Sequence, residues 1–86
     1  MSDLPIEISE HAREQMRERG VDEAEVITAI RSGESELARH NRTMYRKNFQ
    51  FERTWRNRQY RIKQVAPIVA NEPNRLVVVT VFVFYF

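Results

Sequence analysis

The sequence predicts an α+β domain in which two helices, paired as an αα-hairpin, pack on an antiparallel sheet of three or four strands. The 86 residues are enough for one domain, residues 1–86, with one modest hydrophobic core. Residues 76–86 are apolar except for Thr80 and the hydroxyl of Tyr85, and their β-branched and aromatic side chains are typical of one long strand. Because both faces of that strand are apolar, we expect it in the middle of the sheet, with helices over at least one face.

Local capping signals predict the two helices. Ser9 is suited to cap the start of a helix that Gly20 ends. Asp22 and Glu25 form the capping-box pattern of a second helix, which closes at Gly33. We therefore expect two short helices joined by a turn at Gly20.

Alternating side chains predict the remaining strands. Residues 44–51 and 59–65 alternate with period two, as half-buried strands do. Residues 53–59 between them are polar and rich in arginine, so we expect a loop or hairpin turn there. Pro67 cannot donate to a ladder, and the second strand should end there, bulge, or lie at an edge. A short segment at residues 5–8 could supply a fourth strand.

Charge is distributed unevenly along the chain. Residues 1–36 hold ten acidic and four basic residues, a balance of −6, whereas residues 37–86 hold ten basic and two acidic ones, a balance of +8. Twelve of the fourteen basic residues are arginine, whose planar fork suits phosphate oxygens and stacks on bases. A basic face for nucleic acid is therefore favoured over an arginine-rich surface without a ligand.

Composition also limits the compartment and the cofactors. The chain has no cysteine, which excludes disulfides and thiolate metal sites, and its start lacks the pattern of a secretory signal. We expect a cytoplasmic protein without a membrane helix, because the apolar run of residues 76–86 is too short to span a bilayer. His11 and His40 are the only histidines and lack metal-binding spacing, so no metal or other cofactor is predicted.

Basic and aromatic side chains are what remains for chemistry, and RNA can be cleaved with these alone. The 2′-hydroxyl attacks the neighbouring phosphorus, and the protein supplies a base, an acid and cations. The catalytic candidates are His11, Arg46, Arg61, Lys63 and Tyr85. The candidates for nucleic-acid binding are Arg19, Arg42, Lys47, Arg53, Trp55, Arg56, Arg58 and Tyr60.

Structural roles are open for several of these residues. His11 could be an exposed or capping histidine, Arg19 could favour the end of its helix, and Tyr85 could be a core residue with its hydroxyl at the rim. Trp55 differs because a tryptophan in a polar loop is poorly explained by core packing. Stacking on a base or docking into a partner is the preferred interpretation for it.

Residues 11–34, HAREQMRERGVDEAEVITAIRSGE, resemble the opening of a set of small bacterial domains that reads His-Ala-x-x-Arg-Met-x-x-Arg-Gly. Tyr60-Arg61-Ile62 and residues 78–82 resemble that set's closing strands. The set is similar to the RelE/ParE and BrnT toxins and to the barnase, colicin and RelE-like ribonuclease fold. His11, Arg19 and Gly20 match the opening motif, Met16 matches its core residue, and Thr80 matches the closing strand. Gln15 stands where the opening motif has arginine.

The resemblance implies a RelE-like fold in which RNA is cleaved on the open face of the sheet and a cognate antitoxin covers that face. It implies active residues of the arginine, lysine and tyrosine type on the sheet, for which Arg46, Lys47, Arg61, Lys63 and Tyr85 are the corresponding positions. The predicted function is a metal-independent ribonuclease toxin of a toxin-antitoxin system. Its predicted partners are RNA, with ribosome-associated mRNA or tRNA among the candidates, and the antitoxin; a homo-oligomer stays open. The alternatives are a non-catalytic RNA- or DNA-binding regulatory module and a ParE-like gyrase inhibitor.

Overall fold

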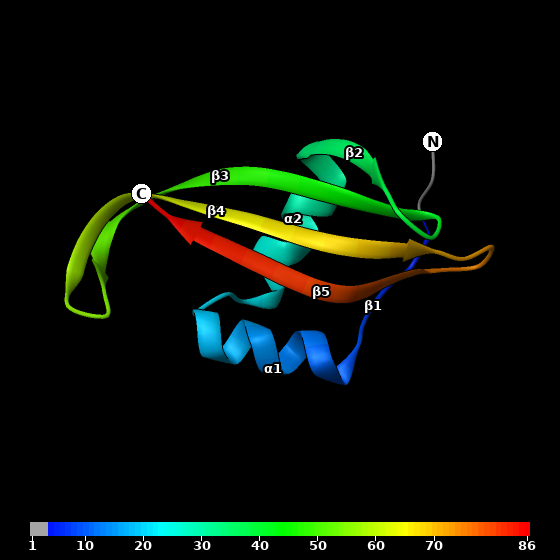
Figure 1. Cartoon of the computed structure of the whole chain (residues 1–86), viewed down its shortest axis with the longest axis horizontal. Coiled ribbons are helices and arrows are strands. Elements are labelled where there is room, and N and C mark those ends of the chain that lie inside the picture. Colours follow the sequence, from blue (N-terminus) through cyan, green and yellow to red (C-terminus); the bar gives the residue numbers. More distant parts are fainter. Residues whose placement is uncertain (1–3) are drawn as a thin grey trace.

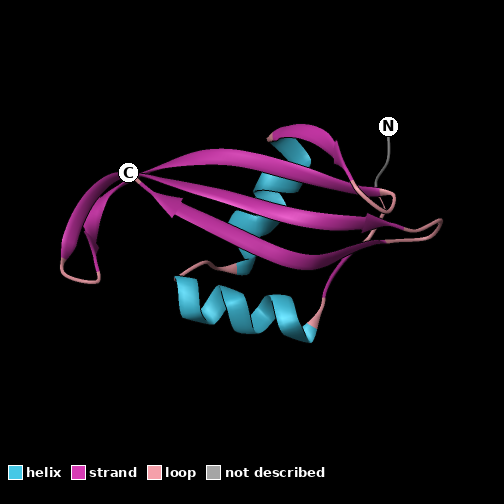
Figure 2. Cartoon of the chain, in the orientation of Figure 1, coloured by secondary structure: helices cyan, strands magenta, loops and turns pink. Residues whose placement is uncertain are grey.

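Two helices and five strands make up the computed structural model, which describes residues 4–86 (Figure 1). In chain order they are β1 (Ile6–Ile8), α1 (Glu10–Arg19), α2 (Glu23–Ser32), β2 (Glu34–Ala38), β3 (Arg42–Trp55), β4 (Arg58–Asn71) and β5 (Leu76–Tyr85). The strands form one sheet, drawn in magenta in Figure 2, and both helices, drawn in cyan, come between β1 and β2 in the sequence.

The sheet has the order β1-β5-β4-β3-β2 and is mixed, because β1 runs parallel to β5 while every other pair is antiparallel. The expected RelE-like antiparallel sheet of three or four strands is therefore wrong. The missed strand is β2, whose residues are almost all exposed, so no alternation of apolar side chains announces it. Its ladder with β3, from Glu34 opposite Arg46 to Ala38 opposite Arg42, supplies the stability that its own sequence does not.

The helix boundaries are confirmed, with their caps. The Ser9 hydroxyl accepts a hydrogen bond from the Ala12 amide, and Gly20 ends α1 in the left-handed conformation with φ 72°. At α2 both hydrogen bonds of the capping box are present, from the Glu25 amide to Asp22 at 2.8 Å and from the Asp22 amide to Glu25 at 3.1 Å. Local sequence alone decides these ends.

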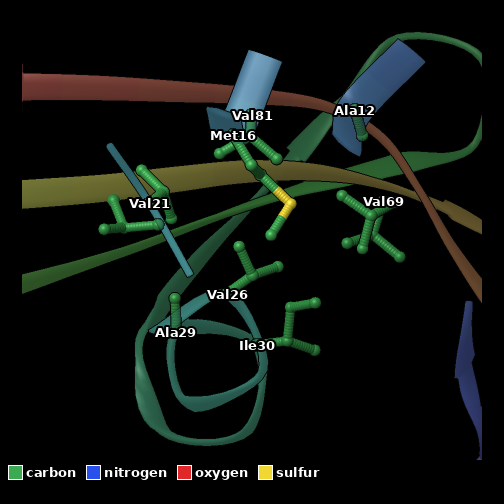
Figure 3. Packing of buried hydrophobic residues seen from close by; sticks show 10 residues of the cluster. Ala12, Met16, Val21, Val26, Ala29, Ile30, Val69 and Val81 are labelled. Atoms are coloured by element: carbon green, nitrogen blue, oxygen red, sulfur yellow. The ribbon is translucent and has the colours of Figure 1, made fainter. Parts of the chain in front are cut away.

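The hydrophobic core lies between the helices and one face of the central strands (Figure 3). Both helices contribute small and branched side chains, which meet valines of β4 and β5. The buried cluster consists of Ala12, Met16, Val21, Val26, Ala29, Ile30, Val65, Val69, Val78 and Val81. Neither of the two helices in residues 4–86 is long and apolar enough to cross a membrane.

The β3–β4 hairpin is longer than predicted and curls back at its tip, on the left of Figure 1. Residues 53–59 are mostly strand rather than loop, and the turn is only Arg56 and Asn57, with φ 51° and 68°. Two positive φ values match the type I′ turn that suits the twist of a hairpin. A bulge between Gln50 and Arg53, with Glu52 at φ 47°, bends the strand toward the helices.

The second strand does not end at Pro67. β4 continues through this buried proline to Asn71, and its register with β5 shifts between Ile68 and Val69. Pro67 itself pairs in register with Val81, and β4 is a central strand. The strand therefore neither ends, bulges nor lies at an edge at the proline, and the shift comes after Ile68.

The strand of residues 76–86 is not in the middle of the sheet along its whole length. β1 covers only Leu76–Val78 of its outer edge. Beyond them α1 runs beside β5, whereas α2 crosses the sheet (Figure 1). The second face of β5 stays open, with Phe82, Phe84 and Phe86 exposed by 37%, 52% and 53%.

Candidate nucleic-acid interface

Four aromatic rings meet where the curled hairpin reaches β5. The ring of Tyr85 lies 5.2 Å from that of Phe51, 5.3 Å from that of Trp55 and 5.5 Å from that of Tyr60, measured between centroids. Trp55 stacks on Tyr85 with an interplanar angle of 19°. These contacts give Trp55 and Tyr60 intramolecular neighbours that the polar sequence around them did not indicate.

The hydroxyl of Tyr85 is tied to the end of α1. It donates a hydrogen bond of 2.6 Å to the backbone carbonyl of Arg19. Burial raises the pKa of Tyr85 above its ordinary value, and the carboxylate of Glu25 adds to this, while Arg56 and Arg53 act in the opposite direction. The phenol therefore keeps its proton to higher pH than it does in the unfolded chain.

Lys63 fixes the hairpin to the turn between the helices. Its side chain is buried, and its ammonium group donates to the carboxylate of Glu25 at 2.8 Å and to the carbonyl of Gly20. At Gly20 an added Cβ would lie 2.7 Å from two ring atoms of Trp55. This turn thus needs glycine both for its positive φ and for the close approach of the hairpin.

Three arginines at the hairpin tip lie over these or neighbouring rings. The guanidinium of Arg53 is 4.9 Å from the ring centroid of Phe51, that of Arg56 is 5.3 Å from Trp55, and that of Arg58 is 5.8 Å from Tyr60. Arg56 also donates to the carbonyl of Glu18 at 2.8 Å. Within residues 4–86, none of the three arginines forms an ion pair with a carboxylate. In this part of the chain their charge is therefore not balanced by a paired carboxylate.

A pocket of about 480 Å³ opens beside the tip. Its lining residues are Glu18, Arg19, Trp55, Arg56, Val83 and Tyr85. Four of these were predicted from the sequence, and they come from three separate elements. Glu18 was missed, because nothing distinguishes it in sequence from the other acidic residues of α1. The pocket combines two guanidinium groups, one carboxylate and an indole ring.

The catalytic candidates do not come together. His11 is exposed at the start of α1, and the rise of the helix puts it about 12 Å from Arg19 along the axis. Arg46 is exposed and forms a 2.8 Å ion pair with Glu36, whereas Lys63 is buried on the helix side of the sheet. Lys63 pairs with Phe49, which is three positions along β3 from Arg46, so the side chains of Arg46 and Lys63 lie on opposite faces of the sheet. These two residues and exposed Arg61 therefore do not form one phosphate site.

Two further binding candidates lie away from the pocket. Lys47 lines a separate pocket of about 260 Å³, whose other residues include Gly33, Arg46 and Gln64. Arg42 stands at the start of β3 opposite Ala70. Their predicted role in binding nucleic acid stays a prediction. Residues 4–86 contain no group of three or more side chains suited to hold a metal ion.

Comparison with known proteins identifies the family. The model described as "Domain of unknown function (DUF4258)" matches residues 8–83, which is most of the chain, so the chain belongs to this family. No curated protein shows a significant match to it. No solved structure does either.

Proposed function

We propose that this DUF4258 domain binds single-stranded RNA through the tip of the β3–β4 hairpin and the adjoining pocket. The observation that carries the proposal is the arrangement of Arg53, Arg56 and Arg58. Each lies over an aromatic ring, and none is neutralised by a carboxylate in the described part of the chain. Unneutralised guanidinium groups beside rings are typical of surfaces that grip a flexible phosphate backbone and stack on its bases.

The pocket adds a place for one nucleotide. Its volume of about 480 Å³ lies in the range of small-ligand sites. Arg19 and Arg56 can pair with phosphate oxygens through their planar forks, and the indole of Trp55 lines the same pocket for contact with a base. Single strands suit this geometry because only unstacked bases can enter a pocket beside a narrow hairpin.

The contacts of the catalytic candidates favour binding over cleavage. The hydroxyl of Tyr85 donates to a backbone carbonyl and its raised pKa moves it away from neutrality, whereas proton transfer is most efficient near the working pH. Lys63 is committed to Glu25 and is not accessible. His11 lies at the other end of α1. The contacts of Tyr85 and Lys63 are therefore structural, and exposed His11 lies away from both.

One observation favours a second candidate, the metal-independent ribonuclease that the toxin resemblance implies. Glu18 lines the same pocket as Arg19 and Arg56, so a base and two cations lie together. In that mechanism the carboxylate takes the proton of the 2′-hydroxyl and the 2′-oxygen bonds to phosphorus. The bond from phosphorus to the 5′-oxygen breaks as the leaving 5′-oxygen takes a proton from water. Toxicity and a cognate antitoxin would accompany that activity.

Fluorescence anisotropy with labelled oligouridylate at several salt concentrations measures the binding. The variant R53Q/R56N/R58Q removes the three charges; asparagine at position 56 tolerates the φ of 51°. The control R13Q/R31Q/R75Q makes the same change in net charge away from the tip. We expect the slope of log K against log salt to fall in magnitude by roughly 2 in the first variant, since each single-strand contact contributes about 0.7, and not in the control. Equal losses in both variants, or no binding by the wild type, would contradict the proposal.

Cleavage is measured on end-labelled RNA in the presence of a chelator. A product with a 2′,3′-cyclic phosphate that is lost in Glu18→Gln, with RNA affinity unchanged, would establish the ribonuclease. Intact RNA at a saturating protein concentration would exclude the ribonuclease and leave RNA binding as the proposed function. Growth arrest on expression without RNA binding or cleavage would instead direct attention to a protein target such as gyrase.

A further inference from the structure

The outer edge of β5 is covered in stages. Its first residues, Leu76–Val78, pair with β1, and the Ser9 amide donates to the Val78 carbonyl at 3.0 Å. At Val81, two side chains of α1 replace β1 as hydrogen-bond partners of this edge. Gln15 accepts from the Val81 amide at 2.9 Å, and Arg19 donates to the Val81 carbonyl at 2.6 Å. Gln15, which departs from the arginine of the resembled motif, thus completes the hydrogen bonding of a strand edge.

The cover stops after Val81. Phe86 and Ile62 exchange both backbone hydrogen bonds, at 2.7 and 3.0 Å, so Phe86 faces β4. Along an antiparallel strand, residues that bond to the partner strand alternate with residues whose backbone N–H and C=O point away from it. The backbone groups of Val83 and Tyr85 therefore point away from β4, as those of Val81 do. In the described chain, residues 4–86, no group pairs with the outward N–H and C=O of these two residues.

Two different surfaces flank this open edge. On one side Phe82, Phe84 and Phe86 are exposed on the open face of the sheet. On the other side Val83 and Tyr85 line the pocket that holds Arg19 and Arg56. Because side chains alternate along a strand, any strand added here meets the phenylalanines with one row of side chains and the guanidinium groups with the other.

We propose that the edge of β5 at Val83 and Tyr85 binds an extended peptide segment of a partner protein in which apolar and acidic side chains alternate. The added strand completes the unpaired backbone groups, its apolar row covers the exposed phenylalanines, and its carboxylates pair with Arg19 and Arg56. This mode of recognition takes its affinity from the main chain and its specificity from the two rows of side chains.

Charge favours such a partner over a second copy of this chain. Residues 76–86 contain no acidic side chain, so the β5 edge of another copy brings no carboxylate from that strand to Arg19 and Arg56. Each pocket holds two guanidinium groups and one carboxylate, that of Glu18, so pairing of two β5 edges would bring two pockets of net positive charge toward one another. Like charges placed opposite each other across an interface are unfavourable.

The proposal goes beyond RNA binding and does not depend on it. Peptide and RNA would occupy the same pocket, so each is expected to displace the other. The experiment that follows contains no nucleic acid, and its result is therefore independent of the RNA titration.

The probe is a blocked peptide of alternating valine and glutamate, titrated into isotopically labelled protein. We expect saturable binding, with the amides of Val83 and Tyr85 protected from hydrogen exchange while the free protein leaves them exposed. Replacing glutamate by lysine in the peptide should abolish binding. Methylating the peptide nitrogens that face β5 should weaken binding by roughly tenfold, because backbone partners are left unmade.

A matched pair of variants separates the edge from the packing of its side chain. Val83→Pro removes one outward N–H at a position where proline costs no ladder bond, and Val83→Ala removes only side-chain volume. The proline variant should lose peptide affinity relative to the alanine variant. The proposal fails if the peptide does not bind, if N-methylation and Val83→Pro leave its affinity unchanged, or if sedimentation shows a dimer in which these amides are protected without peptide.

Discussion

The two hairpin ends of the sheet, at opposite ends of the molecule in Figure 1, use arginine in different ways. At the β4–β5 turn, Arg75 lies between two carboxylates and donates to Glu72 and Glu7 at 2.7 Å each. At the β3–β4 tip, Arg53 and Arg58 contact rings and have no carboxylate partner within residues 4–86. One end is neutralised by the protein itself, whereas the arginines of the other end have no paired carboxylate among the described residues.

The difference comes from what each turn has nearby. Glu72 is three residues before Arg75, so its ion pair is local, and it is also the largest cause of the raised pKa of Arg75. The tip has one acidic residue close in sequence, Glu52, and its carboxylate accepts a hydrogen bond from Gln50 at 2.8 Å. Within residues 4–86, Glu52 thus forms no ion pair with the arginines of the tip.

The largest effect is expected from breaking the anchor that holds the charged end to the helices. Lys63→Ala leaves the carboxylate of Glu25 and the carbonyl of Gly20 without their buried partner. Breaking such a pair costs about 3 kcal/mol here, the lower part of the usual range, because Glu25 keeps some exposure. Denaturant unfolding measures this loss.

The partner variant tells a broken ion pair from lost packing. In K63M/E25Q the charge of Glu25 is removed together with that of Lys63, and methionine keeps most of the lysine volume. This double variant should be more stable than Lys63→Met, which keeps the same volume but leaves the carboxylate of Glu25 without its partner. If the two unfold at the same denaturant concentration, the ion pair is not the cause of the loss.

A smaller loss is expected from the glycine that lets the tip reach α1. Gly20→Ala meets a left-handed backbone and the ring of Trp55, and we expect it to lower the free energy of unfolding by roughly 2 kcal/mol. The stacking of Trp55 should also change, which tryptophan fluorescence reports. In the background of Trp55→Ala the cost should fall to that of the backbone alone; an unchanged cost would show that the ring does not limit this position.

The helices of this fold were predictable and the sheet was not, for physical reasons. Ser9, Asp22 and Gly20 act within one turn of their own helix, so the sequence contains the whole interaction. Strand partners are distant in sequence, and β2 is held by its ladder with β3 although its residues read as polar loop. A parallel pairing of β1 with β5 has no local signal.

The candidate site was partly predictable for the same reason. Residue type identified Trp55, Arg56 and Tyr85, since aromatic and basic side chains are rare together in a core. Register decided the others: Lys63 turns toward the helices and Arg46 toward the open face. A shift of one residue exchanges those faces, and sequence alternation alone does not choose between them.

Tyr85→Phe tests the link between the aromatic cluster and α1. Losing the hydrogen bond to Arg19 should cost about 1 kcal/mol at neutral pH. The pKa of this phenol is raised above 10.0, so the folded protein holds the proton more tightly than the unfolded chain does. Its contribution is complete below pH 10 and is lost as the pH rises through the folded value. The wild type should therefore lose more stability than the variant between neutral and strongly alkaline pH, as unfolding at several pH values measures. Parallel curves would show that Tyr85 is not the group responsible.

The smallest effect is expected at the neutralised end. Arg75→Gln breaks two exposed ion pairs, which contribute little because water screens them, and its unfolding midpoint should stay close to that of the wild type. Its affinity for oligouridylate should also be unchanged, since the lost charge was already balanced by Glu7 and Glu72. Arg58→Gln removes the same charge from the tip and should reduce the magnitude of the salt slope by about 0.7. Equal effects of the two variants on RNA affinity would mean that net charge, and not the unpaired arginines of the hairpin, determines binding.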